Sequence, residues 1–265
     1  MKHHLIGALL ASVSLAGPAA AQTEIQWWHA MGGELGAKLE EIATAFNGTQ
    51  ADYKIVPVYK GTYPETLTAA IAAFRAGEQP AIVQVFEVGT GTMMAAKGAV
   101  YPVHKLMGDQ GVAFDPADYL APVVGYYSDP EGNILSLPFN SSTPILYYNK
   151  DAFAKAGLDP EVAPRTWAEV EEFSRKIKET GAANCGFTTG WVSWVQLENL
   201  SAIHDAPYGT QENGFAGLDT EFSFNGDVQV KHWENLKRWS DEGIFQYGGP
   251  VGGNDAPPKF YSGEC

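Results

Sequence analysis

The spacing of apolar residues separates the chain into alternating strands and helices. Three segments have the pattern of strands, namely 25–28, 53–59 and the continuously apolar run 81–88. Three others place apolar residues at helical spacing, namely 36–46, 64–76 and 92–97. This strand–helix rhythm predicts an α/β fold with a parallel sheet and right-handed crossovers.

The rhythm changes between residues 109 and 144, where loops and turns dominate. We expect a strand at 145–148 and another at 185–189, and helices at 149–156, 167–180, 195–203 and 228–242. Thr166 and Glu169 form a capping-box pattern at the start of one of these helices. We interpret the polar segment 138–144 as a crossing between two lobes, an N-terminal lobe at 22–133 and a partial C-terminal lobe at 134–265.

Residues 1–21 have the pattern of a secretory signal peptide. Lys2 supplies the positive start, a short apolar core follows, and Ala19, Ala20 and Ala21 form a small-residue cleavage site. The core is shorter than the ~20 residues that a membrane-spanning helix needs. We therefore predict export to the periplasm and cleavage, which leaves 244 of 265 residues.

The chain is acidic, with a formal net charge of −14, or −15 once the signal and its one lysine are removed. This charge argues against nucleic acids and anionic membranes as partners. It also repels anions, so an anion site in this chain has to rely on local hydrogen-bond donors.

Two cysteines, Cys185 and Cys265, are present. In an oxidising compartment a pair of cysteines favours a disulfide, and we predict one here. Two separate thiols are the alternative, because spacing in the sequence does not show proximity.

Motifs for metal or covalent chemistry are absent from the sequence. It has no His-Glu-x-x-His, Cys-x-x-Cys or Gly-x-Ser-x-Gly, and the four histidines after residue 21 are scattered. The turn Gly89-Thr-Gly91 lacks the third glycine of a dinucleotide fingerprint. We predict no metal, no cofactor and no enzymatic activity.

Polar and aromatic residues at the ends of predicted strands are the candidate binding groups. Glu87 lies near the end of an apolar strand, where an acid needs hydrogen-bond partners from a ligand or from an internal network. Ser142 offers a hydroxyl at the lobe crossing, although it could instead cap a turn. Trp191 and Trp194 have a spacing that lets them share one helix face, and they either stack on a ligand or pack in the core.

Several longer runs carry a resemblance to a known family. They include Asp52-Tyr-Lys-Ile-Val-Pro57, Ala72-Ala-Phe-Arg75, Glu87-Val-Gly-Thr90, Pro138-Phe-Asn-Ser-Ser-Thr-Pro144, Leu146-Tyr-Tyr-Asn-Lys-Asp-Ala-Phe153 and Gln196-Leu-Glu-Asn199. With them the chain resembles the extracellular solute-binding proteins (family 1) of ABC transporters, and among these the periplasmic binders of sn-glycerol 3-phosphate. The resemblance covers essentially the whole exported chain.

The resemblance implies a periplasmic-binding-protein-like fold of type II, with two lobes joined by a hinge. It implies that a shared set of side chains contacts sn-glycerol 3-phosphate or a glycerophosphodiester: Tyr63, Glu87, Ser142, Trp191 and Trp194. It further implies a monomer that delivers its ligand to permease subunits in the inner membrane, driven by a separate ATPase. A carboxylate only accepts hydrogen bonds, so we expect Glu87 to bind the glycerol hydroxyls and not the phosphate.

Members of this family continue well past the position of Cys265, so we expect the chain to be truncated. The absent part of such proteins supplies further site residues, including an arginine. We predict that this polypeptide binds glycerol 3-phosphate at least ~100-fold more weakly than a full-length relative, because one lost charged hydrogen bond costs about 2–5 kcal/mol. Binding of another solute such as an oligosaccharide, a non-binding truncated relic and an exported enzyme are the alternatives.

Overall fold

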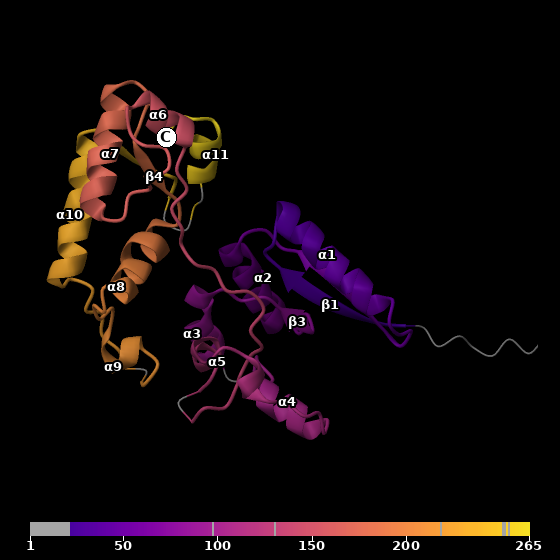
Figure 1. Ribbon diagram of the computed structural model, residues 1–265. Helices are drawn as coiled ribbons and strands as arrows, with labels where there is room; N and C mark the ends of the chain where they lie inside the picture. The colour runs from indigo at the N-terminus through magenta and orange to yellow at the C-terminus, as the bar shows by residue number, and fades with distance from the viewer. Residues whose placement is uncertain (1–21, 97, 130, 218, 251–252, 254) are drawn as a thin grey trace, which may run out of the picture. The chain divides into compact units, whose positions relative to one another are not determined.

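A computed structural model describes most of the chain and divides it into two compact units (Figure 1). The described residues are 22–96, 98–129, 131–217, 219–250, 253 and 255–265, with the backbone alone at 87, 88, 94 and 95. The predicted signal peptide lies outside them. Unit 1 comprises the chain up to Tyr127 and Ile134–Phe139, and unit 2 comprises Ser128–Asn133 and Asn140–Cys265.

Unit 1 is built on a parallel sheet of strand order β2-β1-β3. Strand β1 (Thr23–His29) pairs along its whole length with β2 (Tyr53–Tyr59) and at two positions with β3 (Ile82–Val83). The predicted strand 81–88 is therefore mostly wrong. Pairing continues only as far as the bond from the Gln84 N–H to the Trp28 carbonyl, and the chain then turns into a helix.

The helices of unit 1 are α1 (Gly33–Asn47), α2 (Tyr63–Ala76), α3 (Glu87–Ala95), α4 (Val103–Asp109), the 3₁₀ turn η1 (Pro116–Asp118) and α5 (Ala121–Tyr126). Helices α1 and α2 begin and end close to their predicted positions. The helix predicted at 92–97 is wrong in its bounds, because α3 begins at Glu87, and α4, η1 and α5 were not predicted. A capping box of Thr62 and Glu65 starts α2, and Gly77 in the left-handed conformation ends it. Helix α1 buries Leu39 and Ala43.

The segment 137–149 contains no regular secondary structure, so the strand predicted at 145–148 is wrong. A strand requires a partner for its backbone hydrogen bonds, and neither sheet of the described chain includes this segment. Its side chains Ile145 and Tyr147 are 66% and 68% exposed, so burial does not order it either.

Unit 2 surrounds a two-stranded parallel sheet with helices. Strand β4 (Phe187–Thr189) pairs with β5 (Phe245–Tyr247). The remaining elements are α6 (Lys150–Lys155), α7 (Trp167–Glu179), the π-helix η2 (Trp194–Asn199), α8 (Leu200–Ile203), the short turn α9 (Thr210–Asn213), α10 (Asp227–Asp241) and α11 (Ala256–Tyr261). The predicted capping box of Thr166 and Glu169 at the start of α7 is confirmed.

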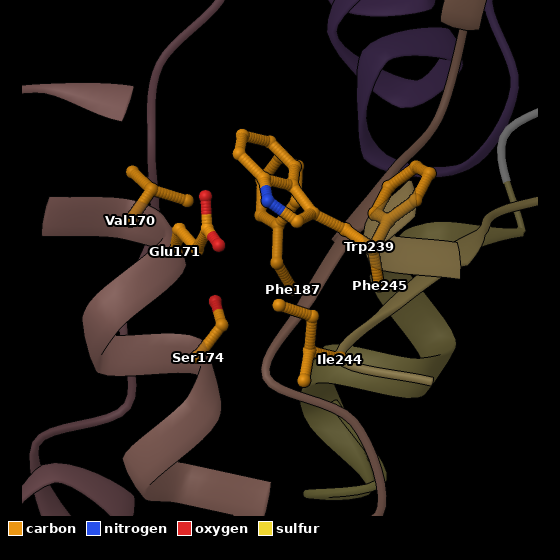
Figure 2. Close-up of a pocket in the computed structure, with 7 residues that line it drawn as sticks. All are labelled: Val170, Glu171, Ser174, Phe187, Trp239, Ile244 and Phe245. Carbon is orange, nitrogen blue, oxygen red and sulfur yellow. The ribbon is translucent and has the colours of Figure 1, made fainter. Parts of the chain in front are cut away.

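Helices α7 and α10 enclose the core of unit 2 with the sheet. Leu236, Trp239 and Phe245 are almost fully buried in one cluster. Figure 2 shows Trp239 facing Val170 and Glu171 of α7, with Phe245 on the side of Trp239 away from that helix. The side chains leave no room for a water molecule between them. A Cβ at Gly186 would lie 2.3 Å from the Ser174 Cα, so only glycine lets the start of β4 approach α7 this closely.

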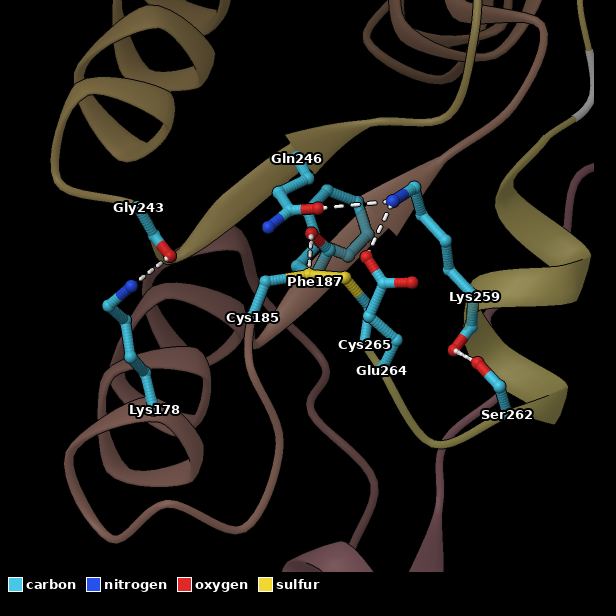
Figure 3. Close-up of a disulfide and its surroundings, with 9 residues drawn as sticks. All are labelled: Lys178, Cys185, Phe187, Gly243, Gln246, Lys259, Ser262, Glu264 and Cys265. Carbon is cyan, nitrogen blue, oxygen red and sulfur yellow. Dashed lines mark hydrogen bonds and ion pairs between the residues drawn. A yellow bond between two sulfur atoms is a disulfide. The ribbon is translucent and has the colours of Figure 1, made fainter.

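A disulfide joins Cys185, just before β4, to Cys265 (Figure 3). The two Cα atoms lie 4.7 Å apart, and the bond closes a loop with a sequence separation of 80. The backbone N–H groups of Asn184 and Cys185 both donate to the Glu264 carbonyl, at 2.9 and 3.1 Å. Lys259 also bonds to Glu264, at 2.7 Å. The segment that follows α11 is thus attached to the sheet by covalent and hydrogen bonds together.

Candidate functional site

The carboxyl end of the sheet in unit 2 is formed by two glycines that follow its strands. Gly190 follows β4 and Gly248 follows β5, and the Gly248 N–H donates to the Thr189 carbonyl at 2.9 Å. A Cβ at Gly248 would lie 2.7 Å from that oxygen, so the close approach needs glycine. Open α/β folds bind ligands at this end of their strands.

Gly190 and Trp191 together form a bend that we call the Trp191 corner. Trp191 has a φ of +50°, which is unusual for a residue with a bulky side chain. Its N–H donates to the Gly253 carbonyl at 2.8 Å, and its side chain is half-buried. Trp191 therefore precedes the helix. The prediction from spacing, that Trp191 and Trp194 share one helix face, is wrong.

Trp194 begins the π-helix η2, a wider turn than the predicted α-helix. The Asn199 side-chain amide donates to the Trp194 carbonyl at 2.7 Å and so satisfies an acceptor within the widened turn. The Trp194 side chain is half-buried. The two tryptophans of the motif thus lie on consecutive irregular turns at the end of β4.

A buried chain of hydrogen bonds lies behind the Trp191 corner, and the sequence analysis missed it. The Thr189 hydroxyl donates to the Gly190 carbonyl at 3.1 Å and accepts from the Gln196 amide at 3.1 Å. The Gln196 oxygen accepts from His232 Nε2 of α10 at 2.8 Å. These three side chains are between 2% and 7% exposed. The sequence did contain a signal for this network: Gln229 and His232 are polar, yet they lie at helical spacing with the apolar residues Leu236 and Trp239 on the buried face of α10.

His232 is held in its neutral form. Burial, with a smaller effect of His204, lowers the pKa of His232 from 6.5 to about 4. The His232 ring also packs against Trp167, with 4.5 Å between ring centroids. A neutral ring with its proton on Nε2 is the form that donates to Gln196.

In unit 1, Tyr63 and the start of α3 lie side by side. The Tyr63 ring stacks on Phe86, with 5.2 Å between centroids and an angle of 6° between planes. Phe86 is the N-cap residue of α3, so Tyr63 lies beside the first turn of this helix. Glu87 is the first residue of α3, so the prediction that it lies near the end of a strand is wrong. Its side chain lies outside the described residues.

His29 at the end of β1 shapes the neighbouring loop. It is 3% exposed, and its Nδ1 accepts the Met31 N–H at 3.3 Å. The Gln84 side chain accepts the Ala30 N–H at 3.0 Å. Burial lowers the pKa of His29, so this ring too is kept neutral. These bonds fix the turn that leads from β1 into α1.

The structure does not bring all predicted site residues to one place within a unit. Tyr63 and the backbone of Glu87 belong to unit 1, whereas Ser142, Trp191 and Trp194 belong to unit 2. Ser142 is exposed in the irregular segment 137–149. Each unit therefore carries its own part of the predicted set.

A hollow of about 370 Å³ in unit 2 contains none of these residues. Glu198, Asp205 and Glu212 contribute to its lining, beside Tyr208 and Ser201. Three carboxylates disfavour an anion there. Within the described chain, no three or more His, Cys, Asp and Glu side chains are arranged to hold a metal ion.

Comparison with known proteins then identifies the family. The family model described as "Bacterial extracellular solute-binding protein" matches residues 32–265. The chain belongs to this family. The predicted family and fold class are therefore confirmed.

Curated relatives of this solute-binding protein share about half of its residues. It is 51% identical over 247 residues to the sn-glycerol-3-phosphate-binding periplasmic protein UgpB of Rhizobium meliloti, covering 93% of this chain and 57% of that one. It is 49% identical over 265 residues to UgpB of Agrobacterium fabrum, covering 100% and 60%. The chain thus spans somewhat more than half the length of these relatives.

Solved structures agree on the fold of the solute-binding protein. An ABC substrate-binding protein from Listeria monocytogenes, in complex with cycloalternan, gives a TM-score of 0.69 at 17% identity, over 92% of this chain and 60% of that chain. The GacH receptor of Streptomyces glaucescens gives a TM-score of 0.69 at 15% identity, over 92% of this chain and 58% of that chain. Among the described residues, no helix is long and apolar enough to cross a membrane.

Proposed function

We propose that this chain is the solute-capturing component of an ABC importer and binds sn-glycerol 3-phosphate in the periplasm. The observation that carries the proposal is the 51% identity over 247 residues to a relative named for that ligand. In this proposal the protein is a monomer, is exported by a cleaved signal peptide, and passes its ligand to membrane permease subunits powered by a separate ATPase. It binds its ligand without chemical change and is not an enzyme.

The proposed contacts divide by the chemistry of the ligand. Trp191, Trp194 and Tyr63 present aromatic surface to the glycerol carbons and keep water from the polar contacts. Glu87 accepts hydrogen bonds from the glycerol hydroxyls. Ser142 donates to the phosphate, which carries close to two negative charges at neutral pH. A charge of −15 on the exported chain makes such local donors necessary.

We further propose that units 1 and 2 act as the lobes of the binding protein. Tyr63 and Glu87 come from unit 1, and Ser142, Trp191 and Trp194 come from unit 2. Each unit therefore contributes part of the proposed contacts.

Isothermal titration with three ligands tests the proposal: sn-glycerol 3-phosphate, inorganic phosphate and glycerol. We expect glycerol 3-phosphate to bind more tightly than either fragment, because only it engages both sets of contacts. Tighter binding of a neutral oligosaccharide would contradict the proposal and favour a sugar-binding protein. The Rhizobium meliloti relative, titrated in parallel, provides a reference affinity.

The substitution Glu87→Gln tests the orientation of the ligand. Removal of a hydrogen bond to a charged group costs about 1.5–3 kcal/mol, so glycerol 3-phosphate binding should weaken by about tenfold or more. Inorganic phosphate binding should not weaken, because it lacks the glycerol hydroxyls. Glu78→Gln, at an exposed site just after α2, removes the same charge and serves as the control. If Glu87→Gln instead strengthens the binding of glycerol 3-phosphate and of inorganic phosphate equally, the acid adds only background charge.

A further inference from the structure

Two departures from regular backbone geometry follow one another at the end of β4. Trp191 has a φ of +50°, and residues Trp194–Asn199 form a π-helix. A bulky residue at positive φ costs about 1–3 kcal/mol and persists only where its surroundings enforce it. π-helical turns are rare and are frequently found at functional sites. Together they indicate that the backbone at this point is held for a purpose other than regular packing.

Gln196 connects both irregular turns to the rest of unit 2. Its amide nitrogen donates to the Thr189 hydroxyl at 3.1 Å, and that hydroxyl donates to the carbonyl immediately before Trp191, also at 3.1 Å. Its oxygen accepts from His232 Nε2 on α10 at 2.8 Å. Gln196 is 2% and His232 5% exposed. A buried network that satisfies its polar atoms in this way favours a single arrangement of the backbone around it.

We propose that Gln196 and His232 are positioning residues, which fix the Trp191 corner and the π-helical turn so that Trp191 and Trp194 are preformed for the solute. This inference rests on the function proposed above, because it takes the two tryptophans as solute contacts. Preorganisation of this kind raises affinity by removing the cost of ordering side chains on binding.

Gln229 provides a matched control on the same helix as His232. It is 2% exposed, as Gln196 is, and its amide donates to Ser201 Oγ and to the Pro207 carbonyl, both at 3.2 Å. Neither bond involves the Trp191 corner, and the connection to η2 is indirect, through the Ser201 hydroxyl that donates to the Leu197 carbonyl at 2.7 Å. Loss of the Gln229 amide should therefore destabilise unit 2 without moving Trp191.

Fluorine NMR of the chain labelled with 5-fluorotryptophan tests the proposal without ligand. The chain has seven tryptophans, and Trp191→Phe and Trp194→Phe assign the two signals. We expect Gln196→Leu and His232→Leu to shift or split both signals. His232→Gln, whose amide reaches about as far as the imidazole Nε2 and restores a donor to Gln196, should leave them near their original positions. Gln229→Leu should leave the Trp191 signal unchanged.

Titration of the same variants with sn-glycerol 3-phosphate provides the second readout. The cost of ordering two side chains predicts about tenfold weaker binding for Gln196→Leu and His232→Leu, and unchanged binding for Gln229→Leu. If the unsubstituted chain binds no glycerol 3-phosphate, the proposed function fails, and the spectra alone then decide whether the network positions the tryptophans.

Two results would overturn the proposal: unchanged Trp191 and Trp194 signals in His232→Leu, or a shift of the Trp191 signal in Gln229→Leu as large as that in His232→Leu. If Gln196→Leu does not fold, the comparison of His232→Leu with His232→Gln is sufficient, because both replacements keep most of the volume and only the second keeps the donor.

Discussion

The two units support their parts of the predicted site in different ways. In unit 2 the Trp191 corner lies next to buried polar side chains, and the same unit has a core cluster of Leu236, Trp239, Ile244 and Phe245. In unit 1, Tyr63 stacks on Phe86 at the start of α3. Helix α1 of that unit keeps Phe46 45% exposed. The strained backbone at Trp191, with a φ of +50°, is therefore held beside buried side chains that hydrogen-bond to the preceding carbonyl, whereas Tyr63 begins a regular helix.

The largest expected difference between the units concerns their phenylalanines. Phe245→Ala removes a side chain that is 1% exposed and should lower the free energy of unfolding by about 3–5 kcal/mol. Phe46→Ala makes the same change on α1 and should lower it by less than about 1 kcal/mol, because its side chain is already partly in water. Urea unfolding followed by circular dichroism measures both. Equal effects would mean that unit 1 has a core as tight as that of unit 2.

The disulfide is expected to stabilise unit 2 nearly as much. The replacement of Cys185 and Cys265 by alanine should lower the free energy of unfolding by about 2–5 kcal/mol, because the unfolded chain loses a closed loop. Unfolding with and without reductant measures the effect, and the double variant should show no response to reductant. Two titratable thiols in denatured, unreduced protein would contradict the assignment of the bond.

The two buried histidines should differ in their effect on pH dependence. The pKa of His232 is about 4 in the folded chain, below its ordinary 6.5, so the unfolded chain takes up a proton first as the pH falls. Its contribution to stability is therefore complete above pH 6.5 and is lost between pH 6.5 and 4, by about 2–3 kcal/mol.

Unfolding in urea at a series of pH values, for the original chain and His232→Gln, checks this prediction. The variant should show a flatter dependence across that window. His29→Gln should flatten it less, although burial lowers the pKa of His29 as well. A larger effect at His29 would reverse the comparison between the units.

Ion pairs should give the smallest difference. Glu171 accepts two bonds from Arg238, at 2.6 and 2.7 Å, and one from Arg175, at 2.9 Å. The bonds from Arg238 lower the pKa of Glu171 from 4.5 to about 2. The contribution of Glu171 to stability is therefore lost as the pH falls from 4.5 to 2.

We expect Glu171→Gln to lower the free energy of unfolding at pH 7 by about 1 kcal/mol, because the carboxylate is partly exposed. Glu24→Gln breaks the exposed pair with Lys54 in unit 1 and should change it by less than about 0.5 kcal/mol. Urea unfolding at pH 7 in low and high salt separates the two. No salt dependence of the Glu171→Gln effect would show that the pairs contribute little.

Local sequence signals predicted much of the secondary structure. The capping box at Thr166, the glycine that ends α2 and the long amphipathic helix α10 all act within a few residues of the chain, so sequence alone identifies them. The errors at 81–88 and 145–148 have a common cause. Apolar and β-branched residues favour a strand, but a strand forms only where a partner supplies hydrogen bonds along its whole length.

The sequence by itself determined the family, the α/β class and the residue types of the candidate site. Only the tertiary structure decided which polar residues lie behind that site: Gln196 and His232 are 36 residues apart and meet because α10 packs beside α8, the helix that continues the π-helical turn. It also decided that Trp191 lies outside the helix and not on its face. Contacts between distant residues depend on packing, and residue spacing along the chain does not encode packing directly.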